Sequence, residues 1–165
     1  GVLMEAVECR RFSAGEEPPW ELLLLADPSG EMVRRYLGRS ELFGCFSGKA
    51  CIAVAAVVPL GEGVCELKNL AVAPPWQRRG IGRLLLGYVC DCCAENFRAM
   101  EVGTGNSSIG NQHFYRSMGF RRFRTDRGFF LRNYPEPIEE DGIPCTDLVK
   151  FRKALARELR TVRAD

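Results

Sequence analysis

The pattern of apolar and polar positions predicts alternating helices and strands along the chain. In the first third, Pro18 and Pro19 mark the start of a helix, and Gly38 marks the end of the next one. The period then changes from helical to alternating, which predicts a hairpin with Gly48 in its turn. We expect a weak strand over residues 3–12, helices over 18–29 and 30–40, and strands over 41–46 and 49–60.

The rest of the chain continues as strand, turn, helix, strand and helix. Apolar positions recur at helical spacing from Ile81 to Phe97, and Gly119 is typical of the residue that follows a helix. The last segment, 145–155, is predicted to be a strand, with a helix as the alternative. We expect strands over 64–72, 98–105, 120–124 and 145–155, and helices over 81–97 and 109–119.

This order of elements predicts one α/β domain over residues 1–165, with a core of 4–155 and a terminal tail of 156–165. The length of 165 residues suits a single domain with a substantial core. The net charge of +2 gives no reason to expect nucleic acid or an anionic membrane as a partner. No apolar run approaches the roughly 20 residues that span a bilayer, and no signal peptide is evident. We therefore expect a cytoplasmic protein.

The eight cysteines lie mostly inside apolar segments. They are predicted to be reduced thiols, buried as small hydrophobic side chains. Cys90 and Cys93 can share one face of a helix, but no second pair with this spacing follows, and His113 is the only histidine. We therefore expect no metal site.

The sequence QRRGIG, residues 77–82, lies between a predicted strand that ends near Val72 and a predicted helix. Backbone N–H groups are free at a helix start, and the helix dipole favours anions there. Gly80 and Gly82 have no side chains, so that a ligand can approach the backbone closely. Positive charge around the same turn comes from Arg78, Arg79 and Arg83. The stretch predicts a phosphate or pyrophosphate cradle; a solvated basic helix start is the alternative.

Residues 70–86, LAVAPPWQRRGIGRLLL, resemble the acetyl-coenzyme A loop of the GNAT superfamily of N-acetyltransferases. Gln77, Gly80 and Gly82 match the family's Arg/Gln-x-x-Gly-x-Gly/Ala signature. Downstream, HFYRSMGF at 113–120 resembles the family's aromatic-Tyr-x-x-x-Gly-Phe element. The resemblance is clearest from residue 64 to 123. It implies an α/β fold with a mixed, mostly antiparallel central sheet flanked by helices, in which a splayed strand pair holds the cofactor.

The resemblance also implies an activity: transfer of acetyl from acetyl-coenzyme A to a primary amine, by direct attack in a ternary complex. The amine acceptor is a small molecule or a peptide or protein, and acetyl-coenzyme A is a co-substrate that works without a metal. The alternative is a non-catalytic domain that binds or senses acyl-coenzyme A. A homodimer is possible, because sheet-mediated dimers occur in similar proteins.

Cofactor contacts follow from the same resemblance. The backbone of the strand end is expected to pair with the pantetheine arm, and the N–H groups of the following turn are expected to bind the pyrophosphate. These two sets are Leu70, Ala71 and Val72, and then Gln77, Arg78, Arg79, Gly80, Ile81, Gly82 and Arg83.

Tyr115 falls on the family's tyrosine, which would protonate the departing sulfur. Its alternative role is packing beside Phe114. Glu66 lies on the strand where some family members carry a general base; an exposed strand residue or a structural hydrogen-bond acceptor is the alternative.

The chain departs from the family in one respect. Many members have an asparagine seven residues before the tyrosine, and here that spacing falls on Ser108, whereas Asn106 lies nine residues before it. Either is a candidate for the cofactor contact, and Asn111, one helical turn before Tyr115, is a third. The acidic stretch 136–141 is either solvated surface or attracts a cationic amine acceptor.

Overall fold

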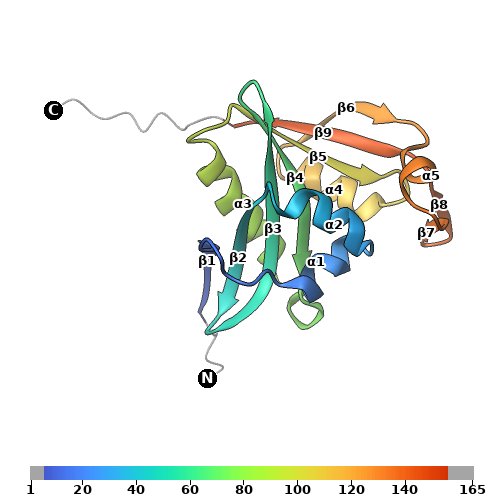
Figure 1. Cartoon of the computed structure of the whole chain (residues 1–165). Coiled ribbons are helices and arrows are strands. Elements are labelled where there is room, and N and C mark those ends of the chain that lie inside the picture. The colour runs from blue at the N-terminus through green and yellow to red at the C-terminus, as the bar shows by residue number, and fades with distance from the viewer. Residues whose placement is uncertain (1–5, 156–165) are drawn as a thin grey trace.

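A seven-stranded sheet forms the centre of the protein (Figure 1). The computed structural model describes residues 6–155. Every pair of neighbouring strands is antiparallel except β4–β5, which is parallel, so the predicted mixed and mostly antiparallel sheet is confirmed. In spatial order the strands are β1 (Val7–Arg11), β2 (Glu41–Ser47), β3 (Ala50–Gly61), β4 (Val64–Val72), β5 (Ala99–Gly105), β9 (Leu148–Ala154) and β6 (Arg121–Asp126).

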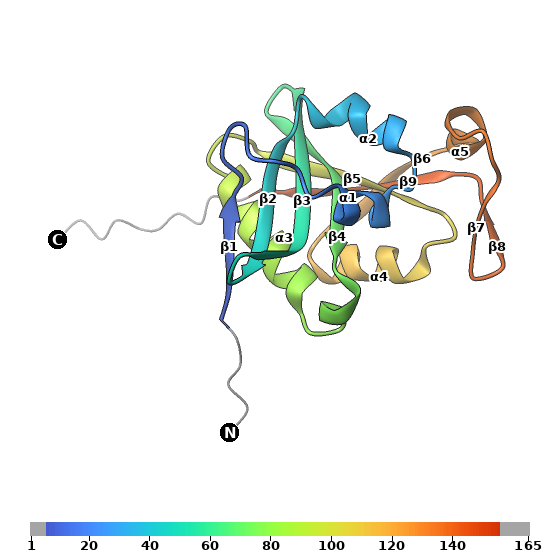
Figure 2. The same cartoon turned by 60° about the horizontal axis from the view of Figure 1, so that its bottom comes forward.

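Helices cover both faces of this sheet (Figure 2). α1 (Trp20–Ala26) and α2 (Gly30–Leu37) pack on one face, and their buried residues form a small core with alternate residues of β3. α3 (Ile81–Cys93) and α4 (Ile109–Ser117) lie on the other face, where the larger core is. Among residues 6–155, no helix has both the length and the apolar composition needed to cross a bilayer.

Most predicted elements occur close to their expected bounds; besides the 3₁₀ turn η1 (Pro74–Trp76), three short ones were not predicted. β4 has the predicted bounds, and the segment 145–155 contains a strand, β9, and not the alternative helix. α3 ends four residues before Phe97, because the chain turns there and Arg98 N–H bonds to Gly63 C=O (2.7 Å) at the start of β5. These three elements are α5 (Phe129–Asn133), β7 (Ile138–Glu140) and β8 (Ile143–Cys145). The predicted tail, 156–165, lies outside the described residues.

β4 and β5 are paired only along their first halves. The pairing runs from Val64–Ala99 to Leu67–Val102 and stops there, although both strands continue. On its other side β4 shifts register against β3 at Lys68, as at a β-bulge, which bends a strand. The predicted splayed strand pair is therefore confirmed.

The splay leaves part of the β4 backbone without a neighbouring strand. Ala73 N–H bonds to Ile52 C=O in β3 (2.8 Å), and backbone groups alternate in direction along an antiparallel strand. The main-chain groups of Ala71 therefore face β3, whereas those of Leu70 and Val72 face the opening toward β5. This edge and the helix that follows it define the candidate site.

Candidate functional site

Two cavities meet at the opening between β4 and β5. The first, of about 570 Å³, lies among α1, α2, β4, β5, α5 and the β7–β8 hairpin. The second, of about 550 Å³, lies between the N-terminus of α3 and α4. The residues that line both cavities are Leu70, Val72, Gln77, Asn111 and Tyr115. Because they share these residues, the cavities adjoin at the end of β4.

The second cavity is formed by the turn that the sequence singled out. Gly80 is the N-cap of α3 with φ of 80°, a conformation that favours glycine, and Arg78 also has positive φ (62°). Leu84 N–H closes the first helical turn by bonding to Gly80 C=O (3.0 Å). The N–H groups of the preceding residues, up to Arg83, have no intrahelical acceptor and are available to an anion. A Cβ on Gly82 would lie 3.6 Å from a Val72 methyl group, at the cavity wall.

The other residues of the turn hold it in place. The Gln77 side-chain amide donates to Val72 C=O (2.9 Å), and the Gln77 backbone N–H donates to Pro74 C=O (3.3 Å). Arg83 bonds through its guanidinium to Ser117 Oγ (3.1 Å) in α4. The guanidinium of Arg79 lies 5.3 Å from the centre of the Trp76 ring. Ile81 is buried in the larger core, and Arg78 is exposed at the cavity rim.

Tyr115 lies where the two cavities join. It is 8% exposed and packs against the rings of Phe114, Phe120 and Phe151, with centroids 5.3, 5.6 and 6.5 Å away. Burial raises the pKa of its hydroxyl well above the usual value, since an apolar environment disfavours the phenolate. The hydroxyl is therefore protonated at every physiological pH and able to donate a hydrogen bond.

Glu66 lines the first cavity as the centre of a charged group. It is 7% exposed, and its two carboxylate oxygens bond to Lys68 Nζ (2.8 Å) and Lys150 Nζ (3.3 Å). Lys150 also lies 3.6 Å from Glu101, which in turn lies 3.8 Å from Arg152. Glu66 is thus a paired, buried carboxylate, and an amine that approaches it has to compete with two ammonium groups.

Of the three candidates before Tyr115, the structure places two at the cavities. Asn111 lines both cavities and Ser108 lines the first, where its hydroxyl bonds to Glu140. The side chain of Asn106 turns elsewhere: its Oδ1 accepts from the backbone N–H groups of Thr146 (2.9 Å) and Asp147 (3.0 Å). Asn106 therefore joins the end of β5 to the segment that leads into β9.

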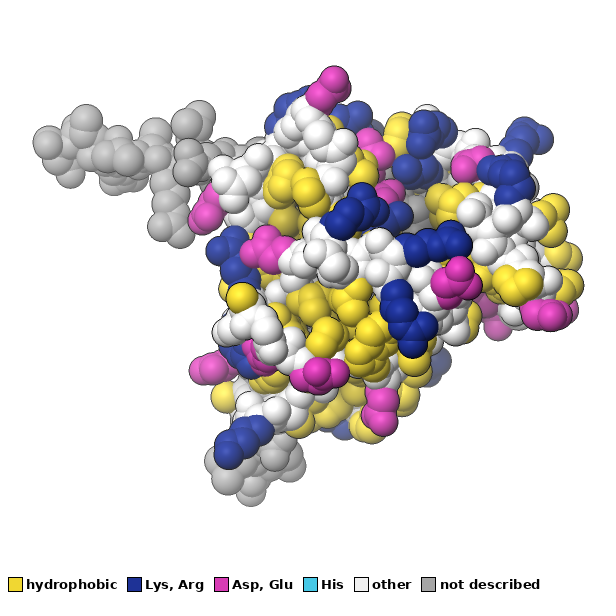
Figure 3. Space-filling view, in the orientation of Figure 1, with side chains coloured by type: hydrophobic (Ala, Val, Ile, Leu, Met, Phe, Trp, Pro, Cys, Tyr) yellow, Lys and Arg dark blue, Asp and Glu magenta, His cyan; other side chains and the backbone are white. Residues whose placement is uncertain are grey.

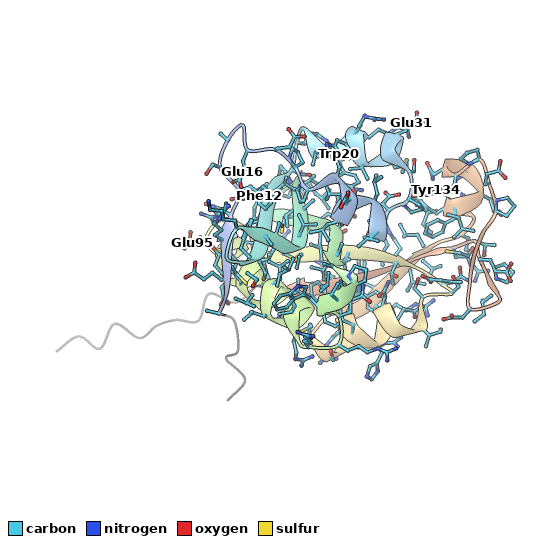
Figure 4. All side chains as sticks on the ribbon, turned by 90° about the horizontal axis from the view of Figure 1, so that it is seen from below. Phe12, Glu16, Trp20, Glu31, Glu95 and Tyr134 are labelled. Atoms are coloured by element: carbon cyan, nitrogen blue, oxygen red, sulfur yellow. The ribbon has the colours of Figure 1, made fainter. Side chains whose placement is uncertain are left out.

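Among the polar residues of the first cavity that were not predicted from the sequence, four make contacts between distant elements. Tyr134, after α5, donates from its hydroxyl to Asp27 Oδ1 (3.2 Å) at the end of α1; Figure 4 shows its side chain between α5 and the two N-terminal helices. Asn69 in β4 bonds through Nδ2 to Tyr36 Oη (3.0 Å) in α2. These contacts join residues 33 to 107 positions apart in sequence, so that no local pattern points to them.

The surface charges, the cysteines and the possible metal ligands bear on the remaining sequence-based expectations. On the face drawn in Figure 3, basic and acidic side chains are interspersed around a central group of hydrophobic ones. All eight cysteines are free. Within residues 6–155, no group of three or more His, Cys, Asp or Glu side chains is arranged to hold a metal ion.

Comparisons with known proteins agree with this geometry. A family model described as "Acetyltransferase (GNAT) domain" matches residues 38–122. The uncharacterized N-acetyltransferase YvbK of Bacillus subtilis (strain 168) is 38% identical over 145 residues, which are 86% of this chain and 94% of YvbK. A GNAT family acetyltransferase from Elizabethkingia anophelis, solved with acetyl-CoA bound, is 38% identical with a TM-score of 0.87, covering 90% of this chain and 97% of that one. A Bacillus subtilis acetyltransferase solved in complex with CoA is 34% identical with a TM-score of 0.84, covering 92% and 100%.

Asn106→Ala should lower the free energy of unfolding by about 1–2 kcal/mol, because it leaves two part-buried backbone N–H groups without their acceptor. Asn106→Asp keeps an acceptor at this position and should lose less. Urea denaturation measures both, with Asn96→Ala, at an exposed asparagine after α3, as the control. Equal stabilities of the Asn106→Ala and Asn96→Ala variants would contradict the structural role of Asn106.

Proposed function

The chain belongs to the GNAT family of acetyltransferases, and from this premise we propose that it transfers acetyl from acetyl-CoA to a primary amine. The observation that carries the proposal is the meeting of three features at one place. The turn before α3 and the unpaired edge of β4 line two adjoining cavities, and the side chain of Tyr115 lines both. Two similar proteins were solved with acetyl-CoA or CoA, which supports the same ligand here.

The residues of the second cavity fit such a ligand. We infer that the free N–H groups from Gly80 to Arg83 bind its pyrophosphate, because the glycines let phosphate oxygens approach the backbone. Leu70 and Val72 would pair with the amide groups of the pantetheine arm through their outward main-chain groups. Val72 C=O already accepts from Gln77, so that its N–H is the group left for the ligand. Ala71 would contribute by holding β4 against β3.

Tyr115 is proposed as the acid of the reaction. When bound, acetyl-CoA supplies an acetyl thioester. The Tyr115 hydroxyl would donate its proton to the sulfur as the amine takes the acetyl group. Burial among aromatic rings keeps this proton in place until that moment, since it raises the pKa of the hydroxyl.

Glu66 is proposed as the group that accepts the proton of the amine, directly or through a water molecule. It is a carboxylate on the wall of the first cavity, on the strand that continues to Leu70. Its two ammonium partners, Lys68 and Lys150, favour the alternative that it serves as the centre of a fixed charge network. The matched variants described below separate these two roles.

A non-catalytic domain that binds or senses acyl-CoA is the second candidate function. Such a domain would bind acyl-CoA through the same turn and the same strand edge. The two candidate functions therefore differ only in whether an acetylated product forms. A panel of amines and peptides, with acetylated products measured by mass spectrometry, decides between them. Location in the cytoplasm and assembly as a homodimer stay predictions.

Gly82→Leu should raise the dissociation constant for CoA at least tenfold, or about 1.4 kcal/mol. A side chain at this position extends from the wall of the second cavity, beside Val72 and Phe114. Gly87→Leu is the matched control, since a Cβ at Gly87 on the same helix meets nothing within 4 Å. Titration calorimetry with CoA measures both variants, and equal affinities would rule out the turn as the binding site.

Tyr115→Phe should reduce kcat by about 100-fold or more, because a general acid contributes roughly that much. The dissociation constant for CoA should stay at its wild-type value, since the ring and its packing remain. Tyr88→Phe on α3 is the control, because it removes a hydroxyl away from both cavities. Steady-state turnover with an amine acceptor is the measurement, and wild-type kcat in Tyr115→Phe would remove the acid assignment.

Glu66→Gln should lower kcat/KM about 100-fold at neutral pH, because an amide cannot accept the proton. Its residual rate should rise about tenfold per pH unit toward the pKa of the free amine, since only the neutral amine then reacts. The control is Glu101→Gln, which weakens the same network at Lys150. If both variants show the same rates and the same pH profile, Glu66 is structural.

A further inference from the structure

Asp27 is a half-buried carboxylate that makes no ion pair with any cation of residues 6–155, although the charge of Lys68 acts on it from a greater distance. It lies directly after α1 and lines the first cavity. Its Oδ1 accepts from Ser29 N–H (3.1 Å) and from the hydroxyl of Tyr134 (3.2 Å), whereas within the described residues no hydrogen bond or ion pair involves Oδ2. Burial raises the pKa of the carboxyl, which shows that the anion is poorly solvated where it stands.

Asn69 supplies an independent observation in the same cavity. Its side chain is nearly inaccessible, at 3% exposure, and its Nδ2 donates to Leu23 C=O (2.8 Å) and to Tyr36 Oη (3.0 Å). Its Oδ1 is buried and has no partner among the described residues. A buried acceptor without a donor costs about 1–3 kcal/mol, and its unmatched lone pairs add negative potential to this wall of the cavity.

The nearby ammonium groups are already paired with other acids. Lys68 Nζ lies 5.9 Å from the centre of the Tyr36 ring but bonds to Glu66 (2.8 Å), and Lys150 bonds to the other oxygen of Glu66. The remaining charged residues on the cavity wall are acidic, Asp27, Glu139 and Glu140. The unpaired charge facing the cavity is therefore negative, and it attracts cations.

Asp27 and Tyr115, the proposed acid, lie at different places in the cavities. Asp27, Tyr36 and Tyr134 line the first cavity only, whereas Asn111 and Tyr115 line both. A group bound at Asp27 is therefore a part of the acceptor other than the amine that reacts. The wall of the first cavity also includes apolar side chains, among them Leu25, Met32 and Ile138, which suit methylene groups.

We propose that the acceptor is an aliphatic diamine, with one amine at Tyr115 and the other, as an ammonium, bound by Asp27. The rings of Tyr36 and Tyr134 would flank this ammonium, and their faces attract cations. The inference rests on the proposed function. One amine nitrogen gains the acetyl group and loses a proton, CoA leaves as the free thiol, and the product keeps one cationic end.

The test uses the full chain with acetyl-CoA and three acceptors of equal carbon number: cadaverine, pentylamine and aminovalerate. Acetylated products are quantified by mass spectrometry. We expect kcat/KM for cadaverine to exceed that for pentylamine by about 10–100-fold, as for a hydrogen-bonded charge, and aminovalerate to be the poorest acceptor.

Asp27→Asn should bring the ratio of cadaverine to pentylamine close to one, mainly through the KM for cadaverine. Asparagine keeps the oxygen that accepts from Ser29 N–H, and so the fold of this corner. Asp91→Asn, an exposed acid on α3, is the control and should keep the wild-type ratio.

Equal rates for cadaverine and pentylamine, or an unchanged ratio in Asp27→Asn, would overturn the diamine inference and leave the acetyltransferase function standing. A preference for aminovalerate would overturn it in favour of Lys68 as the anchor. Product from peptides but from none of the three acceptors would overturn it as well. No product from any amine or peptide would reject the proposed function, and the inference with it.

Discussion

The site depends on one constraint, the loss of pairing between β4 and β5 after Leu67 and Val102. Backbone N–H and C=O groups inside a sheet need partners, and an unpaired strand edge is a template for whatever can supply them. In this protein the open edge ends at Val72, and the turn that leads into α3 follows within eight residues, so that backbone donors of two kinds follow one another along the chain. A ligand with amide groups at one end and phosphates at the other matches that order, much as an added strand matches a sheet edge.

Charge is distributed over this opening in two different ways. Glu66 is buried beside Lys150 and is also paired with Lys68, which reaches it from the exposed side; Glu101 extends the group, so that each buried charge has an opposite charge beside it. Asp27 is held by neutral donors alone, a backbone N–H and a tyrosine hydroxyl. The first arrangement has its ion-pair partners within the protein, whereas the second has none. An amine that approaches Glu66 therefore competes with two ammonium groups, and an amine that approaches Asp27 displaces none.

Local signals predicted the elements around the second cavity, and long-range contacts determine the first. Residues close by in sequence mark the bounds of β4, of the turn at Gly80 and of helices α3 and α4. Glycines with positive φ are one such local feature. Asn106 could not be placed in this way, because its partners lie about 40 residues away in a segment with weak periodicity. The cavity wall from α5 to β8 was missed for the same reason. The spacing of residues did not predict that β4 and β5 separate to hold a cofactor; only the resemblance to the family implied it.

The burial of Tyr115 has two opposing effects on its proposed role as an acid. A free thiol titrates near 8.5 and a tyrosine near 10, so in water a tyrosine protonates a thiolate only at an energetic cost. Desolvation raises the pKa of Tyr115 further, which makes it a weaker acid. The same apolar surroundings, however, raise the proton affinity of any sulfur that departs beside it, since a thiolate is also disfavoured there. Proton transfer depends on the difference between the pKa of the tyrosine hydroxyl and that of the thiol. Because the same apolar surroundings raise both pKa values, this difference stays small. The tyrosine nevertheless carries its proton when the thiolate leaves. A histidine in this place would lose its proton within the physiological range, whereas the tyrosine keeps its proton throughout that range.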